Sequence, residues 1–146
     1  MILNERVEMG VDAADGRSQL VLLHKRLKRI ARIRGALDVN EAEALREAQR
    51  LQLWRQFGYS SLADYMTNEL GYSFRTAEDR LRMANALPQL PNLTAALQTG
   101  NLNFSQAREL ARVATPDTEQ VWIDKAADRH ARDRTRQRRG DFSPRR

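Results

Sequence analysis

Five polar residues at helical spacing after a glycine are the side chains best suited to recognition chemistry: Ser73, Arg75, Thr76, Asp79 and Arg82. Arg75, Asp79 and Arg82 are four and three residues apart, so they share one face of a helix. An arginine can bond a guanine edge or a phosphate through its forked donors, and a short hydroxyl side chain at a helix start can meet a phosphate or a base. The five residues are therefore predicted to contact DNA, although the carboxylate of Asp79 also repels phosphate.

Two further groups of cations lie elsewhere in the sequence. The first occupies ten residues without an intervening acid and comprises Lys25, Arg26, Lys28, Arg29, Arg32 and Arg34. The second is residues 129–146, which hold eight arginines and two aspartates, a balance of +6. The other 128 residues carry 17 basic and 17 acidic side chains, so all of the excess charge lies in this tail.

Both groups predict contacts with a polyanion. For the first group the alternative is structural, because cations in the last turn of a helix also complement its dipole. Six like charges in ten residues exceed what a dipole needs, so we expect them to bind phosphates. In the tail the same role is expected above all of Arg136, Arg138 and Arg139.

The sequence contains no recognisable constellation for catalysis or metal binding. Cysteine is absent, and neither His24 nor His130 has a second histidine at a ligand spacing. The seven glycines are scattered, so no phosphate-binding loop is expected, and no serine belongs to a known triad motif. We therefore predict no enzyme activity, no metal, no cofactor and no small-molecule substrate.

The compartment is predicted from two absences. No apolar run approaches the roughly 20 residues that a membrane span needs. The N-terminal residues lack the basic-then-apolar order of a signal peptide. A cytoplasmic protein without a membrane partner is the expectation.

The elements that must position the charged side chains are expected to be helices. Leucine, alanine, arginine, glutamate and glutamine are plentiful, and no segment shows a convincing strand alternation. At 146 residues the chain is expected to form one compact all-α, multi-helix domain. We divide it into a loose leader at 1–17, a helical DNA-binding domain at 18–128 and an arginine-rich, partly disordered tail at 129–146.

Two long helices are predicted in the first third of the chain. The first is placed at 19–34 and is expected to end at Gly35. The second is placed at 41–56, with Asp38 or Asn40 at its start and Gly58 as its end. The apolar side of the first helix comprises Leu20, Leu23, Leu27 and Ile30, and it continues at Ile33 or Arg34.

Residues 60–87 predict a helix-turn-helix at the centre of the domain. Ser60 or Ser61 can cap its first helix, Gly71 can end that helix with φ > 0, and Ser73 can cap the second. The second helix of such a unit can enter a DNA major groove, but an ordinary helical hairpin has the same pattern. The spacing departs from the usual one at Arg80, which stands where an inward apolar residue is expected.

Three more helices are predicted after this central pair, at 91–98, at 104–114 and from about 117 to 134. Asn103 and Gln106 have the spacing of a capping box before the middle one. Beyond Ala131 no apolar partners remain, so the arginine-rich end is expected to fray into a disordered arm.

Several short motifs occur in order over residues 58–126. They include GYSSL at 58–62, LGYS at 70–73, RTA at 75–77, RLR at 80–82, REL at 108–110 and VATP at 113–116. In these motifs the chain resembles the helical domain that precedes the nuclease module in bacterial HNH endonuclease-type proteins. The resemblance covers about half of the chain and implies a DNA-handling domain. The His-Asn-His core of those nucleases has no counterpart in this sequence.

DNA binding through the helix-turn-helix and the basic patches is therefore the function that we expect, with DNA as the partner. One alternative is a helical adaptor or oligomerisation module, which could form a homo-oligomer. Another is a truncated or split nuclease that acts with a separate HNH chain.

Overall fold

The computed structural model describes residues 5–140, with side chains from residue 14 onward, and residues 1–4 and 141–146 lie outside the described part. All the regular structure in this part is helical, which confirms the predicted all-α class. The elements in chain order are α1 (Glu5–Leu51), α2 (Leu53–Gln56), α3 (Leu62–Glu69), α4 (Phe74–Ala86), the 3-10 helix η1 (Leu87–Gln89), α5 (Pro91–Gln98), α6 (Phe104–Ala111) and α7 (Glu119–Gly140).

A single helix, α1, replaces the two helices predicted between residues 19 and 56, so the predicted end at Gly35 and the predicted start at Asp38 or Asn40 are wrong. Gly35 is buried in the middle of α1, against α5. A Cβ atom there would collide with the carbonyl oxygen of Leu97. The glycine thus serves close packing between two helices, and this contact offsets its low helix propensity. The helix ends instead at Leu51, before Gln52 with φ 54°.

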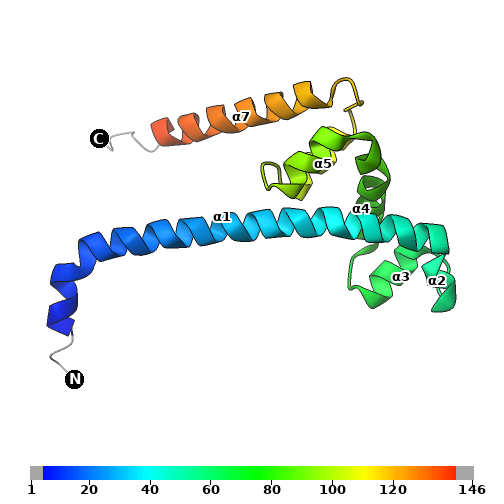
Figure 1. Ribbon diagram of the computed structural model, residues 1–146, viewed down its shortest axis with the longest axis horizontal. Coiled ribbons are helices and arrows are strands. Elements are labelled where there is room, and N and C mark those ends of the chain that lie inside the picture. The colour runs from blue at the N-terminus through cyan, green and yellow to red at the C-terminus, as the bar shows by residue number, and fades with distance from the viewer. Residues whose placement is uncertain (1–4, 141–146) are drawn as a thin grey trace.

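In the body of the protein, residues 35–127, α4 and α5 pack on the second half of α1, α3 packs on α4, and α6 packs on α4 and α5 (Figure 1). Its core is formed mainly by leucine, alanine and methionine, because short side chains let the helices approach closely. Met66, Leu93 and Leu97 are the largest of the completely buried side chains. The body therefore provides a rigid base for the two ends of the chain.

The central pair consists of α3 and α4, joined by residues 70–73. The predicted caps are present: Ser61 Oγ accepts from Asp64 N at 3.0 Å, and Ser73 Oγ accepts from Thr76 N at 3.2 Å. Gly71 has φ 75°, as predicted for the end of the first helix. Two helices and a short turn of this kind occur in DNA-binding units and in ordinary helical hairpins alike.

The last helix, α7, is longer than predicted, because it continues to Gly140 instead of ending near residue 134. Residues 129–140 of the expected disordered tail are therefore helical, and the predicted tail residues 141–146 lie outside the described part. Glu119, only 2% exposed, holds the start of α7 to α5: its carboxylate accepts from Asn92 N at 3.0 Å and Leu93 N at 3.1 Å. This contact also caps α5.

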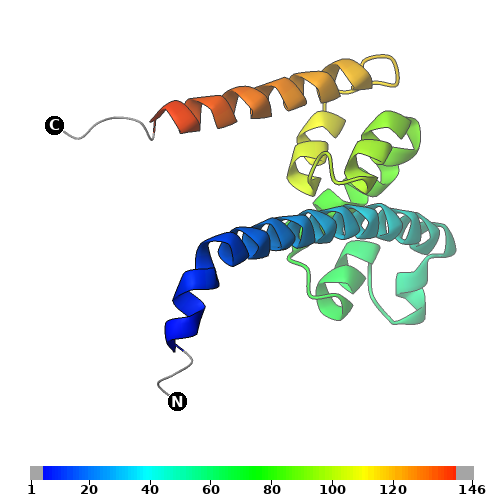
Figure 2. The same ribbon diagram turned by 60° about the vertical axis from the view of Figure 1, so that its left-hand side comes forward.

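Two arms project from the body in the same general direction (Figures 1 and 2). The α1 arm is residues 14–34 of α1, and the α7 arm is residues 128–140 of α7. Residues 5–13, part of the predicted loose leader, continue the helix of the first arm. Among the described residues, no helix is long and apolar enough to cross a membrane.

Candidate nucleic-acid interface

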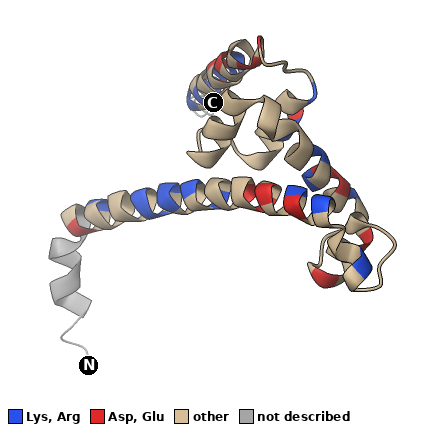
Figure 3. Ribbon diagram, turned by 45° about the vertical axis from the view of Figure 1, so that its right-hand side comes forward, with Lys and Arg blue, Asp and Glu red and all other residues tan. Residues whose placement is uncertain are grey.

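The cations of the α1 arm are all exposed to solvent. In the described part of the chain, no ion pair involves any of the set Lys25, Arg26, Lys28, Arg29, Arg32 and Arg34. Figure 3 shows them as a nearly continuous basic segment of the helix. The stretch ends where the body begins, and acidic Asp38, Glu41 and Glu43 follow it. The six cations are thus free to bind an external anion.

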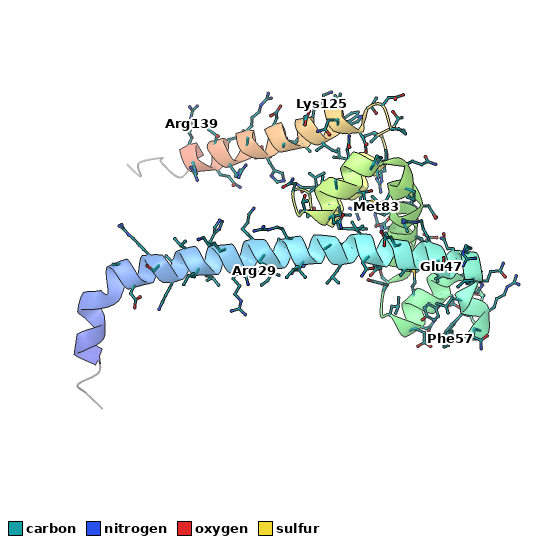
Figure 4. All side chains as sticks on the ribbon, in the orientation of Figure 1. Arg29, Glu47, Phe57, Met83, Lys125 and Arg139 are labelled. Carbon is teal, nitrogen blue, oxygen red and sulfur yellow. The ribbon has the colours of Figure 1, made fainter. Side chains whose placement is uncertain are left out.

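The α7 arm has the same character. Its arginines at 129, 132, 134, 136, 138 and 139 are exposed, and none belongs to an ion pair within residues 14–140. The side chains of Arg139 on this arm and Arg29 on the other stand clear of the body (Figure 4). Because the arm is helical to Gly140, its arginines have fixed spacing and are not scattered along a flexible chain.

One open cleft lies between the two arms. Lys28 lines it from the α1 arm, and His130 and Arg134 line it from the α7 arm. Its floor is the loop at 100–102, where Gly100 has φ 78° and lies so close to Arg32 that a Cβ atom would be 3.0 Å from that side chain. The cleft therefore brings Lys28 and Arg134, from two distant parts of the sequence, to one place, and Asp124 also lines it.

The five predicted contact residues of α4 have a different setting. Ser73 and Thr76 are bonded to each other, the Ser73 hydroxyl donating to Thr76 Oγ1 at 2.9 Å. The carboxylate of Asp79 is largely buried and accepts from Arg82 and Arg108, each at 3.2 Å. Arg75 and Arg82 remain exposed. Of the five, these two arginines are the side chains best able to reach an external anion.

The structure does not join α4 and the arms into one surface. Arg80 of α4 pairs with Asp38, and Arg46 Nη1 donates to the carbonyl of Ala84 at 2.8 Å, so α4 crosses α1 along the acidic segment between Asp38 and Arg46. From Arg29 to Arg46 the helix rises by roughly 25 Å at 1.5 Å per residue. In Figure 1 the arms extend to the left, and α4 lies at the right. The cationic sites predicted from sequence thus form two groups, the arms and the exposed side of α4.

Arg80, which broke the expected pattern, points into the body. Its Nη1 lies 2.5 Å from Asp38 Oδ1, and its guanidinium lies 3.8 Å from the centre of the Phe104 ring. Tyr72 donates to Glu41 Oε2 at 2.6 Å beside it, and burial together with this hydrogen bond raises the pKa of Tyr72. The cluster ties α1, α4 and α6 together. The sequence marks this arginine as misplaced but does not identify its partners.

The described residues contain no group of histidine, aspartate and glutamate side chains arranged to hold a metal ion. His130, one of the two histidines, contacts the side-chain amide of Gln106 at the edge of the cleft. The features that the structure gives this site are exposed cations, their spacing on two helices and a cleft between the arms.

Comparison with known proteins gives a family and no closer relative. No curated protein and no solved structure matches the chain. A family model described as "Domain of unknown function (DUF222)" matches residues 24–145, which include the whole body, the α7 arm and the α1 arm from residue 24 onward. On this match over most of its length, the chain belongs to the DUF222 family.

Proposed function

We propose that the protein binds DNA, with the α1 arm and the α7 arm as the principal phosphate-binding surfaces. The observation that carries this proposal is that the lysines and arginines of the two arms are exposed and without an ion-pair partner in the described chain. Held on helices, the cations of each arm have fixed positions along the helix axis and lie on several sides of it. The protein is the DNA-handling part of an HNH endonuclease-like system, and it would act in the cytoplasm.

The charge distribution supports a polyanion as the ligand. Neutralising a phosphate releases condensed counterions, so each contact adds about 0.9 to the slope of log affinity against log salt concentration. Cations already paired with carboxylates would give up those partners first. The unpaired cations of the arms carry no such cost, which favours the arms over the arginines of the body.

The family supports DNA as the polyanion. Domains of this family are known to occur N-terminal to HNH nucleases, whose substrate is DNA. In this proposal, a helical domain in that position delivers the duplex to the nuclease module. The same association supports a second candidate, in which this chain acts with an HNH nuclease on a separate chain.

The helix-turn-helix takes a secondary part in this proposal. Arg75 and Arg82 are exposed on α4 and can reach a phosphate or a base edge. The carboxylate of Asp79 holds Arg82 and Arg108, so it orients arginines and does not itself contact DNA. Ser73 and Thr76 stabilise the start of the helix, where a phosphate could also approach.

The test is a titration of duplex DNA at several salt concentrations with two charge-matched triple variants. The arm variant carries Lys25→Gln, Lys28→Gln and Arg29→Gln, and the body variant carries Arg50→Gln, Arg55→Gln and Arg112→Gln. Both lose three exposed cations. The arm variant should lower the salt slope by about 2.7, at 0.9 per phosphate contact, and the body variant should leave the slope nearly unchanged.

Two outcomes would contradict the proposal. One is binding by the unaltered chain without a salt slope. The other is an equal decrease of the salt slope in both variants, which would show that binding depends only on the net charge of the protein.

A further inference from the structure

A stripe of apolar side chains on the α1 arm has no partner in the described part of the chain. It is formed by Leu20, Leu23, Leu27, Ile30 and Leu37, which are 39–67% exposed. Monomeric proteins seldom leave a contiguous apolar surface of this kind in water, and such surfaces commonly mark an interface. We call these five residues the apolar stripe.

The apolar stripe is separate from the body-facing and cleft-facing sides of α1. Gly35 and Val39 are buried against the body, whereas Leu37 between them is 60% exposed. Lys28 faces the cleft shared with the α7 arm, and it stands about 80° around the helix from Leu20 at 100° per residue. The stripe lies on the other side of Leu20, so neither the body nor DNA held in the cleft covers it.

The spacing of the stripe is that of a coiled coil. Its residues are separated by three, four, three and seven, and Arg34 occupies the one position where the alternation of three and four would place another apolar residue. The side chains next to the stripe are mostly uncharged, since Gln19, His24, Ala31 and Ile33 flank it with Arg26. Lys25, Lys28, Arg29 and Arg32 fall on the outer positions, away from the seam.

We infer that the apolar stripe pairs with the same stripe of a second copy of this chain in an antiparallel coiled coil. In this register Leu20 of one copy lies against Leu37 of the other, and Leu27 lies against Ile30. This register is symmetric about a two-fold axis. Each contact between one residue of the first copy and another residue of the second copy recurs with the two copies exchanged. The interface leaves Lys25, Lys28, Arg29 and Arg32, which fall on the outer positions, exposed.

The position of Arg34 decides the orientation. In a parallel pair two copies of Arg34 would face each other in the seam, and like charges held together there oppose association. In the antiparallel pair Arg34 faces Leu23, so its aliphatic stem covers apolar surface while its guanidinium reaches water. The flanking pairs then become Arg26 with Ile33 and His24 with Ala31. No like charges meet along the overlap from residue 20 to residue 37.

This inference does not depend on DNA binding and is tested without DNA. Sedimentation equilibrium of the full chain should give a dimer at micromolar concentration. Leu27→Asp should weaken dimerisation by about 100-fold or more, because a two-fold interface loses two buried leucines and gains two buried charges. Leu22→Asp is the matched control: Leu22 is 66% exposed but lies off the stripe, so this variant should still dimerise.

Helical circular dichroism should be the same for both variants, since neither leucine belongs to the core. A monomer at 100 µM for the unaltered chain would overturn the inference. So would a dimer that Leu27→Asp and Leu22→Asp affect equally.

Disulfide trapping tests the orientation, because the chain has no cysteine of its own. Leu20→Cys and Leu37→Cys are prepared as single variants, mixed and oxidised. The antiparallel pair should give the mixed disulfide between the two variants and little disulfide from either alone, since a disulfide needs Cα atoms within about 7 Å. Efficient linking of Leu20→Cys to itself would instead show a parallel pair and overturn the proposed register.

Discussion

Most arginines of the body form ion pairs within the protein, whereas those of the two arms are unpaired in the described chain. In the body, five arginines lie within ion-pair distance of carboxylates: Arg50, Arg80, Arg82, Arg108 and Arg112. In the arms, the described arginines and lysines are exposed and have no such partner within residues 14–140. The difference shows that carboxylates close by, more than the number of arginines, decide whether a cation forms an ion pair within the protein or is available to a ligand. Helix geometry then decides which cations act together.

The largest effect on stability is expected at Arg80. Arg80→Ala leaves the carboxylate of Asp38, 12% exposed, without its partner and removes the guanidinium from the Phe104 ring. The free energy of unfolding should fall by about 3 kcal/mol, as for other largely buried pairs that lose one member. Urea unfolding followed by circular dichroism measures this change.

The arm counterpart of that variant is Arg136→Ala. Arg136 is exposed and unpaired in the described chain, so the unfolding free energy should change by no more than about 0.5 kcal/mol. Equal losses in Arg80→Ala and Arg136→Ala would break the distinction between structural and available cations.

Two glycines of the same helix give the next contrast. Gly35→Ala places a methyl group against the backbone of α5, and the unfolding free energy should fall by about 2 kcal/mol despite the better helix propensity of alanine. A Cβ atom added at Gly16 on the α1 arm would meet no atom within 4 Å, so Gly16→Ala should raise helix stability by up to about 1 kcal/mol. Thermal unfolding of the two variants compares them, and a stabilising Gly35→Ala would show that α5 does not pack closely on α1.

A smaller, pH-dependent effect is expected at Tyr72. Tyr72→Phe removes the hydrogen bond to Glu41 and should cost about 1 kcal/mol at neutral pH. Burial and this hydrogen bond raise the pKa of Tyr72 above that of an unfolded tyrosine, about 10. Its contribution is therefore fully present below pH 10 and is lost as the pH rises through the higher folded value.

The difference in stability between the unaltered chain and Tyr72→Phe should accordingly shrink in alkaline solution. Urea unfolding at pH 7 and above pH 10 measures it. A difference that grows with pH would contradict the assigned sign.

The smallest effect is expected on DNA selectivity at α4. Arg75→Gln should weaken all duplexes alike, by no more than the arm substitution Arg29→Gln, because each removes at most one phosphate contact. Binding to a panel of duplexes of different sequence compares the two variants. If Arg75→Gln alone changed the order of affinities among the duplexes, α4 would be the element that recognises sequence. The arms would then bind DNA without sequence preference.

Much of the local structure could be predicted from sequence because its causes are local. The caps at Ser61 and Ser73 and the capping box of Asn103 with Gln106 join groups three residues apart, and all are present. Gly71 ends its helix for a reason that also lies within one turn. The charge division between residues 1–128, which sum to zero, and the basic tail at 129–146 is likewise fixed by counting residues.

Two of the failures have tertiary causes. Gly35 gives the local signal of a helix end, but it lies inside α1 because α5 packs against it. Arg80 breaks an apolar line, and only the fold brings Asp38, 42 residues away in sequence, to its guanidinium. The frayed arm expected beyond residue 134 is helix as far as Gly140.

By itself the sequence determined the helical class, the caps and the presence of three cationic groups, because composition and spacing of a few residues suffice for these. Only the tertiary structure decided which groups meet. It carried Lys28 and Arg134, more than 100 residues apart in sequence, to one cleft, and it placed α4 at the far end of the body. The physical reason is that helix packing depends on contacts between distant segments, and no local window of residues contains both partners of such a contact.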